Sequence, residues 1–270
     1  MNKIKRVLIC LSALLIIALT VTACGSSAGS GSANGGQKVL KVGVDDTYPP
    51  MEFKDESNNT VGFDIDVATE LAKKMDMKAE FISNDWAGIF LALEANKFDV
   101  IVSSVSRNED RLAKYSMTTP YIANAQVIVV PADNSSIKEP KDLEGKNVGV
   151  QIGTTADESC AEYLKTTKFT LKQYDQVIQP FSDMKAGRLD AIVVDEVVAR
   201  YYVNKDSKSY KVSSARLTNE PIGICFAKNN TEMRDKAQKA LEELFADGTM
   251  KKLSEKWFGE DLTGNVKDVK

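Results

Sequence analysis

Short runs rich in valine and isoleucine alternate with amphipathic helical patterns along most of this 270-residue sequence. The first run, residues 39–44, precedes a helical pattern over residues 65–75, and the same succession continues toward the C-terminus. Strands that alternate with helices favour an α/β fold with mostly parallel sheets. The runs are continuously apolar, as expected of strands that are covered on both faces of a sheet. The predicted fold class is therefore α/β.

The predicted elements follow from these two patterns, with a break near Pro120. Runs rich in β-branched residues predict strands at 39–44, 78–82, 99–102, 125–130, 147–151, 170–174, 191–194 and 222–227. Apolar residues at helical spacing predict helices at 65–75, 86–95, 155–164, 177–186, 197–204 and 231–258.

One eight-residue segment occurs twice in related form. Residues 95–102 read Ala-Asn-Lys-Phe-Asp-Val-Ile-Val, and residues 186–193 read Ala-Gly-Arg-Leu-Asp-Ala-Ile-Val. Val-Gly-Val also occurs at both 42–44 and 148–150. The separation of about 90 to 105 residues is far too long for a solenoid repeat. It predicts two similarly built lobes, although common turn chemistry between a helix and a strand is an alternative explanation.

The N-terminus has the parts of a secretory signal. Three basic residues lie within the first six positions, and the apolar run over 7–19 is too short to favour a membrane-spanning helix. The sequence Val-Thr-Ala-Cys at 21–24 resembles the bacterial lipobox, whose cysteine becomes the lipid-modified first residue. This pattern predicts a lipoprotein signal peptide at 1–23 and lipidation of Cys24. The alternative is an ordinary signal peptide with an incidental cysteine.

Residues 24–37 are rich in glycine, serine, alanine and asparagine and are not able to form a core. They predict a flexible, lipid-anchored tether with a root-mean-square reach of about 20 Å. The globular part is expected at 38–270. Loss of the three basic residues in the signal peptide takes the net charge from −3 to −6, and no basic tract follows. Nucleic-acid binding is therefore not expected.

Two features of the composition limit the catalytic, metal and disulfide sites that this chain can form. The sequence has no histidine, which excludes histidine-based triads and most transition-metal sites. After Cys24 the only cysteines are Cys160 and Cys225, and they do not form a Cys-x-x-Cys pair. Neither a disulfide framework nor a zinc site is indicated. We expect no metal and no cofactor.

Residues 62–68, Gly-Phe-Asp-Ile-Asp-Val-Ala, followed by Leu71-Ala72, resemble the signature of the polar amino-acid family of ABC-transporter substrate-binding proteins. Other blocks agree in order and spacing over residues 38–258. They are Asp-Asp-Thr-Tyr-Pro-Pro-Met-Glu-Phe at 45–53, Lys-Phe-Asp-Val-Ile at 97–101, Ser104-Val105-Ser106 with Arg111, Thr-Pro-Tyr at 119–121, Gly149-Val150, Gly153-Thr154-Thr155, Gly-Arg-Leu-Asp-Ala at 187–191, and Asp195.

This resemblance implies a two-lobed periplasmic-binding-protein type II fold, with two hinge crossover strands and a ligand in the cleft. Lobe 1 would comprise residues 38–123 and 222–270, and lobe 2 residues 124–221. The crossovers would pass near 123–126 and 220–223. Cys160 and Cys225 would then lie in different lobes, so we expect free thiols.

A receptor for an α-amino acid must neutralise a carboxylate and an ammonium after both leave water. Arg111 suits the carboxylate because a guanidinium presents two parallel donors, and the family motif supports this role. On local sequence alone, a solvated surface arginine is the alternative. Asp195 ends a predicted strand, and its family counterpart receives the ammonium; helix capping would also explain it.

Gly153-Thr154-Thr155 lies between a predicted strand and a predicted helix, where backbone N–H groups favour an anion. Thr154 and Thr155 are therefore expected at the head group, with an N-cap role for Thr155 as the alternative. Polar contacts are expected from the serines Ser103, Ser104 and Ser106.

Asp45, Tyr48 and Trp86 occupy positions that face the ligand side chain in members of the family. Trp86 could stack on that side chain, and core packing is the alternative. Ala156 differs from the glutamine of several binders of basic amino acids, which weakens a strict arginine or histidine assignment. The pair Asp64 and Asp66 is interpreted as structural, through capping and hydrogen bonds at a helix start.

The resemblance implies an extracytoplasmic lipoprotein, anchored at the outer face of the bacterial cell membrane, that delivers a free L-α-amino acid to an ABC permease and ATPase. The expected ligand is polar or cationic, such as arginine or lysine, or is cystine. The protein is expected to be a monomer without catalytic residues. One alternative is an aromatic amino-acid-binding lipoprotein that also acts as an adhesin or sensor. Another is an enzyme on the same fold, such as one like cyclohexadienyl dehydratase.

Overall fold

Two five-stranded sheets organise the part of the chain that the computed structural model describes, residues 37–264 and Val266. The predicted signal peptide, Cys24 and all but the last residue of the predicted tether lie outside these residues. We call each sheet, with the elements that pack on it, a lobe.

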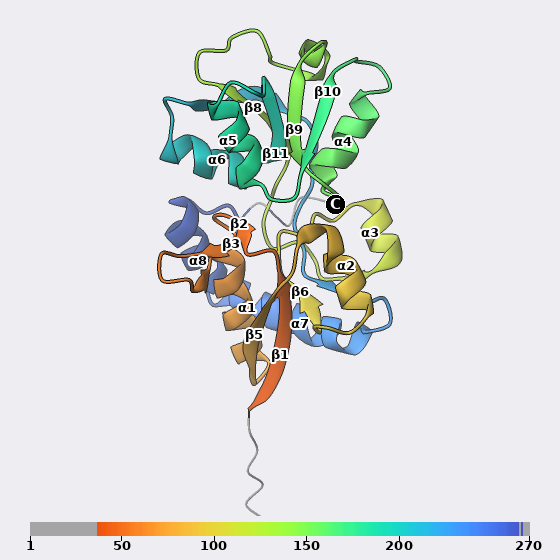
Figure 1. The fold of residues 1–270 in the computed structure, drawn as a ribbon. Helices are drawn as coiled ribbons and strands as arrows, with labels where there is room; N and C mark the ends of the chain where they lie inside the picture. Colours follow the sequence, from red (N-terminus) through yellow and green to blue (C-terminus); the bar gives the residue numbers. More distant parts are fainter. Residues whose placement is uncertain (1–36, 265, 267–270) are drawn as a thin grey trace, which may run out of the picture. The chain divides into compact units, whose positions relative to one another are not determined.

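Lobe 1 takes its elements from both ends of the described chain (Figure 1). They are β1 (Lys38–Val44), β2 (Thr47–Tyr48), β3 (Glu52–Lys54), β4 (Thr60–Val61), α1 (Phe63–Lys74), β5 (Met77–Ser83), α2 (Trp86–Glu94), β6 (Val100–Ile101), α3 (Glu109–Lys114), β7 (Ser116–Met117), β13 (Cys225–Phe226), α7 (Thr231–Ala246) and α8 (Thr249–Phe258).

Lobe 2 is continuous in sequence. Its elements are β8 (Gln126–Pro131), a short 3₁₀ turn η1 (Pro140–Leu143), β9 (Asn147–Gln151), α4 (Thr155–Tyr163), β10 (Thr170–Tyr174), α5 (Ile178–Lys185), β11 (Ala191–Asp195), α6 (Glu196–Lys205) and β12 (Tyr210–Arg216).

The two main sheets have the same topology. The strand order is β5-β1-β6-β13-β7 in lobe 1 and β10-β9-β11-β8-β12 in lobe 2. In each, three parallel strands are followed by two antiparallel pairings. The predicted α/β fold class is confirmed, but the expected "mostly parallel" sheets are mixed. The reason is that β8 and β13 enter their sheets from the other lobe through extended crossovers, without the helix that a parallel connection requires.

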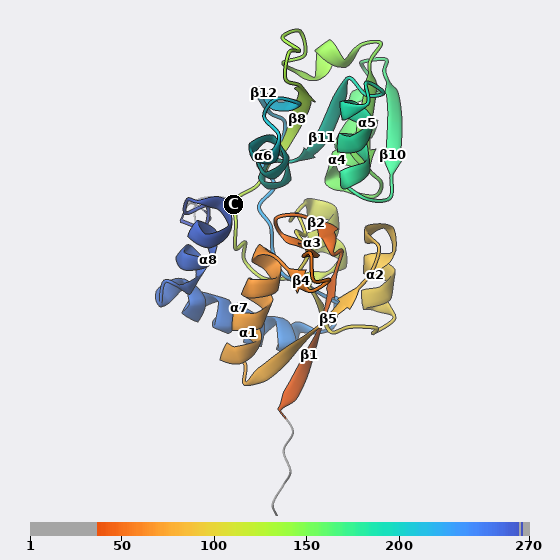
Figure 2. The same ribbon diagram turned by 60° about the vertical axis from the view of Figure 1, so that its left-hand side comes forward.

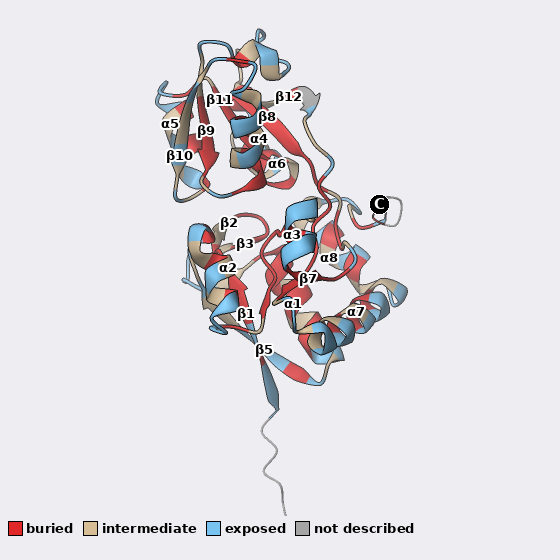
Figure 3. Ribbon diagram, turned by 90° about the vertical axis from the view of Figure 1, so that its right-hand side faces the viewer, coloured by how far each residue is buried: buried red, intermediate tan, exposed pale blue. Residues whose placement is uncertain are grey.

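Each sheet is covered by helices on both faces. In lobe 1, α1 and α7 pack together on one side, with α8 beside them, and α2 packs on the other side (Figure 2). Successive strand residues point to opposite faces: Val100 and Val102 belong to the core under α1, whereas Ile101 belongs to the core under α2. Figure 3 shows the result, with buried strands and exposed outer helix faces.

The repeated sequence segment has the same packing role in both lobes. The ring of Phe98 lies over Gly43 of β1, where an added Cβ would come within 2.4 Å of the ring. Leu189 lies over Gly149 of β9 in the same way, within 2.5 Å of an added Cβ. Only glycine allows this close approach, which explains why the Val-Gly-Val sequences accompany the repeated segment.

The aspartate of the repeated segment also acts alike in the two lobes. Asp99 accepts a hydrogen bond from the N–H of Lys41 at 2.8 Å, and Asp190 accepts one from the N–H of Asn147 at 2.8 Å. Asp99 thereby links the start of β6 to β1, and Asp190 links the start of β11 to β9. The shared packing and hydrogen bonding account for the repeated segment. A chance match between two turns that join a helix to a strand is not needed to explain it.

Two extended segments connect the lobes side by side. The N–H of Ile222 donates to the carbonyl of Ile122 at 3.0 Å, and the N–H of Glu220 donates to that of Asn124 at 2.9 Å. These segments lie at the predicted hinge positions. Both segments are extended and hydrogen-bonded to each other, and Ile122 and Ile222 are buried in the core where the segments meet lobe 1.

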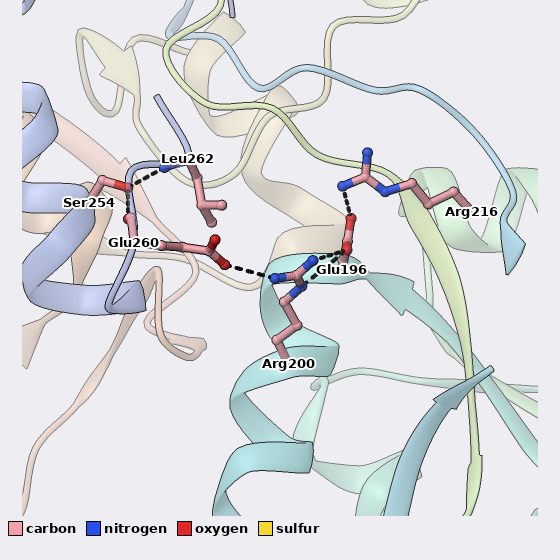
Figure 4. A network of polar contacts seen from close by, with 6 residues as sticks. All are labelled: Glu196, Arg200, Arg216, Ser254, Glu260 and Leu262. Atoms are coloured by element: carbon pink, nitrogen blue, oxygen red, sulfur yellow. Dashed lines mark hydrogen bonds and ion pairs between the residues drawn. The ribbon is translucent and has the colours of Figure 1, made fainter. Parts of the chain in front are cut away.

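An ion-pair network joins the lobes beside these segments (Figure 4). Arg200 of α6 pairs with Glu260, which follows α8, at 2.9 Å and with Glu196 of its own helix at 2.6 Å. Arg216 also pairs with Glu196. The segment that carries Glu260 is held by Ser254, whose hydroxyl donates to the Glu260 carbonyl at 2.8 Å.

Several element boundaries differ from the prediction. The helix expected at 231–258 is divided into α7 and α8 at Gly248, whose φ of 76° interrupts a right-handed helix. Strand β12 and the small β2-β3-β4 sheet were not predicted. Cys160 and Cys225 are buried free thiols, one in each lobe. Within the described residues, no helix combines the length and the apolar character needed to cross a membrane.

Candidate functional site: a cavity between the lobes

A cavity lies where residues of both lobes meet. It holds about 270 Å³ of space free of protein atoms, some of it open to solvent. Lobe 1 contributes Tyr48, Glu52, Trp86, Ser103, Ser104, Ser106 and Arg111 to its wall, and lobe 2 contributes Thr154, Thr155 and Asp195. The structure therefore brings together nine of the ten ligand-binding residues that the sequence predicts, with Asp45 as the exception.

Arg111 lies in α3 and is buried, with 7% of its surface exposed. Asn108 caps α3 by accepting the N–H of Arg111 at 2.8 Å, which fixes the start of the helix. The guanidinium donates to the carbonyl of Ser106 at 3.2 Å, and its Cζ lies 5.4 Å from the centre of the Trp86 ring and 5.2 Å from that of Phe90. The alternative of a solvated surface arginine is wrong.

The charge of Arg111 has no carboxylate partner at ion-pair distance within the described part of the chain. Among the described residues, the arginines that form ion pairs are Arg188, Arg200, Arg216 and Arg234. Burial lowers the pKa of Arg111, because the charged form loses hydration. A buried guanidinium is stable only with a compensating charge or full hydrogen bonding. The site is therefore suited to an anionic group.

Asp195 ends β11 and is buried in the part of the cavity wall that lobe 2 contributes. Its carboxylate accepts hydrogen bonds from the hydroxyl of Tyr48 at 2.8 Å and from the side-chain amides of Asn124 and Gln126 at 2.6 Å each. It precedes α6 but does not cap that helix with its side chain, so the capping alternative is wrong.

Burial raises the pKa of Asp195 to about 6, even though hydrogen bonds from Asn124 and Tyr48 oppose the shift. All three of its hydrogen-bond partners are neutral, and Asp195 forms no ion pair with a cationic side chain of the described residues. The carboxylate is thus oriented in the cavity wall without charge compensation. It is suited to a cationic group, such as an ammonium.

The N-terminus of α4 forms part of the same wall. Thr154, not Thr155, is the N-cap, because its hydroxyl oxygen accepts the N–H of Asp157 at 3.3 Å. The hydroxyl of Thr155 accepts from the amide of Gln126 at 3.0 Å and lies 3.4 Å from the hydroxyl of Ser106 in lobe 1. The alternative N-cap role of Thr155 is therefore wrong, and Thr155 lines the cavity.

Ser103 connects two acidic residues at the base of the cavity. Its hydroxyl donates to Glu52 at 2.7 Å and accepts the N–H of Asp45 at 2.9 Å. Asp45 itself lies beside the cavity and not in its wall. Its carboxylate accepts from Thr47 at 2.6 Å and, across the lobes, from Gln151 at 2.7 Å.

Trp86 combines the two roles that the sequence left open. Its ring belongs to the core that includes Ile89 and Leu93, and it also lines the cavity. Its indole N–H donates to the carbonyl of Gly153 in lobe 2 at 2.8 Å. Trp86 therefore closes one side of the cavity as well as packing under α2.

Three residues of the site were not predicted. Glu52 lines the cavity but had been noted only as part of a family block, while Asn124 and Gln126 orient Asp195 from the crossover and from β8. No local pattern marks a glutamine at a strand start as a site residue. Their proximity to Asp195 depends on how the crossover meets β11, which only the tertiary structure establishes.

Known proteins resemble this chain along nearly its whole described length. The model of the bacterial extracellular solute-binding proteins, family 3, matches residues 40–260. The L-cystine-binding protein TcyJ of Escherichia coli strain K12 is 32% identical over 83% of this chain and 84% of its own. The arginine-binding extracellular protein ArtP of Bacillus subtilis strain 168 is 33% identical over 90% of this chain and 94% of its own.

A solved structure agrees with both the fold and the family. An ancestral arginine-binding protein bound to arginine is 41% identical, with a TM-score of 0.79, and covers 83% of this chain and 99% of its own. Such relatives are two-lobed amino-acid-binding proteins, which accords with the paired sheets described above. The chain belongs to the bacterial extracellular solute-binding proteins, family 3.

Proposed function

We propose that this protein binds a free L-α-amino acid in the cavity between its lobes. Arg111 would receive the α-carboxylate and Asp195 the α-ammonium. The observation that carries the proposal is the pair of opposite charges buried in the wall of one cavity, neither of which forms an ion pair with a side chain of the described residues. A zwitterion supplies both missing charges at once.

The geometry of the donors supports this head-group role. The guanidinium of Arg111 offers parallel N–H groups that match a planar carboxylate. Thr155 and Ser106 place hydroxyl groups nearby, and the N-terminus of α4 adds a favourable electrostatic field for an anion. Because Arg111 belongs to lobe 1 and Asp195 to lobe 2, one ligand would contact both lobes and thereby favour the closed conformation.

The remaining wall supports a polar or cationic side chain. Glu52 and Tyr48 offer oxygen atoms, and Trp86 offers an aromatic face for stacking or for a cation. Arginine, lysine and cystine are the candidates, in line with relatives named for arginine and cystine. Ala156 is buried in α4 and does not line the cavity. The glutamine that several binders of basic amino acids have at this position is absent, so no such side chain restricts the cavity near the start of α4.

We further propose that the protein is a monomeric lipoprotein at the outer face of the bacterial cell membrane, where it delivers its ligand to an ABC permease and ATPase. Lipidation would occur at Cys24, and residues 24–37 would act as the tether. Cys24→Ser should release the protein from washed membranes into the medium without changing ligand binding. Retention of this variant on the membrane would contradict the lipid anchor.

A thermal-shift screen tests ligand binding directly. The purified protein would be heated with each standard L-amino acid, with L-ornithine and with L-cystine. Ligand at 100 times its dissociation constant should stabilise the fold by about 2.7 kcal/mol, which corresponds to a rise in Tm on the order of 5–10 °C. Ligand recovered unchanged after incubation would also oppose the enzyme alternative. No shift with any of these compounds would overturn the proposed function.

Arg111→Ala provides the matched mutational test. It should weaken binding by about 2–5 kcal/mol, the scale for leaving one partner of a buried charge pair alone. Arg188→Ala is the control, because Arg188 pairs with Asp183 on the surface of lobe 2 and does not line the cavity. Calorimetric titration of both variants gives the comparison. Equal affinities would mean that Arg111 does not hold the carboxylate.

A further inference from the structure

Ser104 has an unusual backbone conformation within the cavity wall. Its φ is +47°, in the left-handed region that residues other than glycine rarely adopt. Its side chain is buried, and its hydroxyl oxygen has no hydrogen-bond partner among the described residues. Strained residues persist only where surrounding contacts hold them, and they concentrate at functional sites. The question is which contact holds Ser104.

Asp64 is that contact. Its Oδ2 accepts the backbone N–H of Ser104 at 2.7 Å, and its Oδ1 accepts the hydroxyl of Tyr121 at 2.7 Å. Asp64 is fully buried in the first turn of α1, yet it does not cap that helix. Neither Asp64 nor Tyr121 lines the cavity. The carboxylate of Asp64 therefore does not cap α1. It instead accepts a hydrogen bond from the backbone of Ser104, which is a residue of the cavity wall.

The neighbouring Glu52 determines where the negative charge lies. Burial and the nearby charge of Asp64 raise the pKa of Glu52 well above its usual value. Burial raises the pKa of Asp64 less, to about 6, because the hydrogen bonds from Tyr121 and Ser104 oppose the shift. Asp64 is therefore the more acidic of the two and carries the negative charge in preference to Glu52. The hydrogen bond to Ser104 is thus charge-assisted, which makes it a strong one.

We propose that Asp64 is a positioning residue of the ligand site, which holds Ser104 in its left-handed conformation and so presents the Ser104 hydroxyl to the amino-acid head group. Asp64 acts through Ser104 and does not touch the ligand. The sequence predicts a structural role for Asp64, and its hydrogen bond serves a residue of the cavity wall. This inference rests on the proposed function, since it assigns Asp64 to that same site.

A double-mutant cycle in ligand affinity separates positioning from a general structural role. The probe would be L-arginine or L-cystine, whichever stabilises the unmodified protein more in the thermal-shift screen. Asp64→Asn should weaken binding by about tenfold, because a charge-assisted hydrogen bond becomes a neutral one. Glycine adopts positive φ without strain. In a Ser104→Gly background, Asp64→Asn should therefore cost less than about twofold.

Two control variants belong to the same cycle. Asp66→Asn changes a carboxylate of the same helix that accepts from Trp257 and Lys256 and does not line the cavity, so it should leave affinity unchanged. Tyr121→Phe removes the other donor to Asp64 and should lower stability without lowering affinity. If Asp64→Asn weakens binding equally in both Ser104 backgrounds, or if Tyr121→Phe weakens binding as much, the positioning role is overturned.

A measurement without ligand keeps this inference separate from the proposed function. Amide hydrogen exchange followed by NMR should show the Ser104 N–H exchanging at least about tenfold faster in Asp64→Asn, while amides of β1 stay protected. If no amino acid binds the unmodified protein, the proposed function fails. Unchanged exchange at Ser104 would contradict the positioning role whether or not a ligand binds.

Discussion

At the scale of single residues, the site depends on charges that the surrounding side chains orient but do not neutralise. Sequence reasoning found Arg111 and Asp195 because their residue types and spacing suit a zwitterion. It did not find Asn124 and Gln126, whose side-chain amides orient Asp195. The sequence around an asparagine in a crossover or a glutamine in a strand does not indicate that the side chain belongs to a ligand site. It left Glu52 unassigned because the burial of its carboxyl follows only from the packing of β3 against the rest of lobe 1.

Asp195 predicts a pH dependence of ligand binding. Its pKa is raised to about 6 by burial, with a further contribution from the negative charge of Glu220. A ligand ammonium would lower this pKa, so binding near pH 6 should release a proton. Affinity should be constant above about pH 7 and fall by up to about tenfold per unit below pH 6. Calorimetric titrations between pH 5 and 8 test this expectation, and a flat profile would contradict it.

The ligand-free protein should show the opposite trend. A carboxylate whose pKa is raised by folding takes up its proton more readily in the folded state than in the unfolded state. For Asp195, the proton stabilises the folded state fully below pH 3.8, which is the pKa of the carboxyl group in the unfolded state. This stabilisation is lost as the pH rises through about 6, the pKa in the folded state. Asp64 contributes with the same sign. Urea unfolding of the free protein at pH 5 and pH 7 provides the comparison for these groups.

At the scale of elements, the sequence predicted most of the strands and helices because both lobes use strongly apolar strands. The exceptions have local causes. Gly248 divides the C-terminal helical stretch by its left-handed conformation, and β12 has few apolar residues to mark it as a strand. The antiparallel pairings of β8 and β13 were missed because they depend on the crossovers between the lobes.

The contact between Phe98 and Gly43 predicts a sharp response to one added methyl group. Gly43→Ala should destabilise the protein by about 1–3 kcal/mol, because the new Cβ would overlap the Phe98 ring. Gly88→Ala is the matched control, since the nearest atom to its added Cβ is 3.5 Å away and alanine favours the helix α2. Urea unfolding measures both. A neutral Gly43→Ala would mean that this close approach is not required.

At the scale of the whole molecule, hydrogen bonds connect the lobes around the cavity. Tyr48 reaches Asp195, Trp86 reaches Gly153, and Gln151 reaches Asp45. These contacts join the lobes around the cavity, while the two crossovers provide the only covalent connections between the sheets among the described residues. The balance between open and closed forms therefore depends on these contacts together with the ligand.

The ion pair between Arg200 and Glu260 predicts a small, salt-dependent contribution to closure (Figure 4). Glu260→Gln removes this contact between the lobes and leaves Arg200 paired with Glu196. Affinity for ligand should fall by less than about fivefold at low salt, the scale of an exposed ion pair, and the difference should vanish at high salt. Arg216→Gln, which removes a pair within lobe 2, should not change affinity. A loss of affinity that is insensitive to salt would exclude an ionic origin.

The central claim is that one cavity holds both charges of an α-amino acid, and modified ligands test it most directly. The amino acid that stabilises the protein most would be compared by calorimetry with its α-carboxamide and its N-acetyl derivative. The account predicts that each derivative binds at least about a hundredfold more weakly, because each leaves Arg111 or Asp195 buried without an opposite charge. Binding of either derivative with the affinity of the free amino acid would contradict the account.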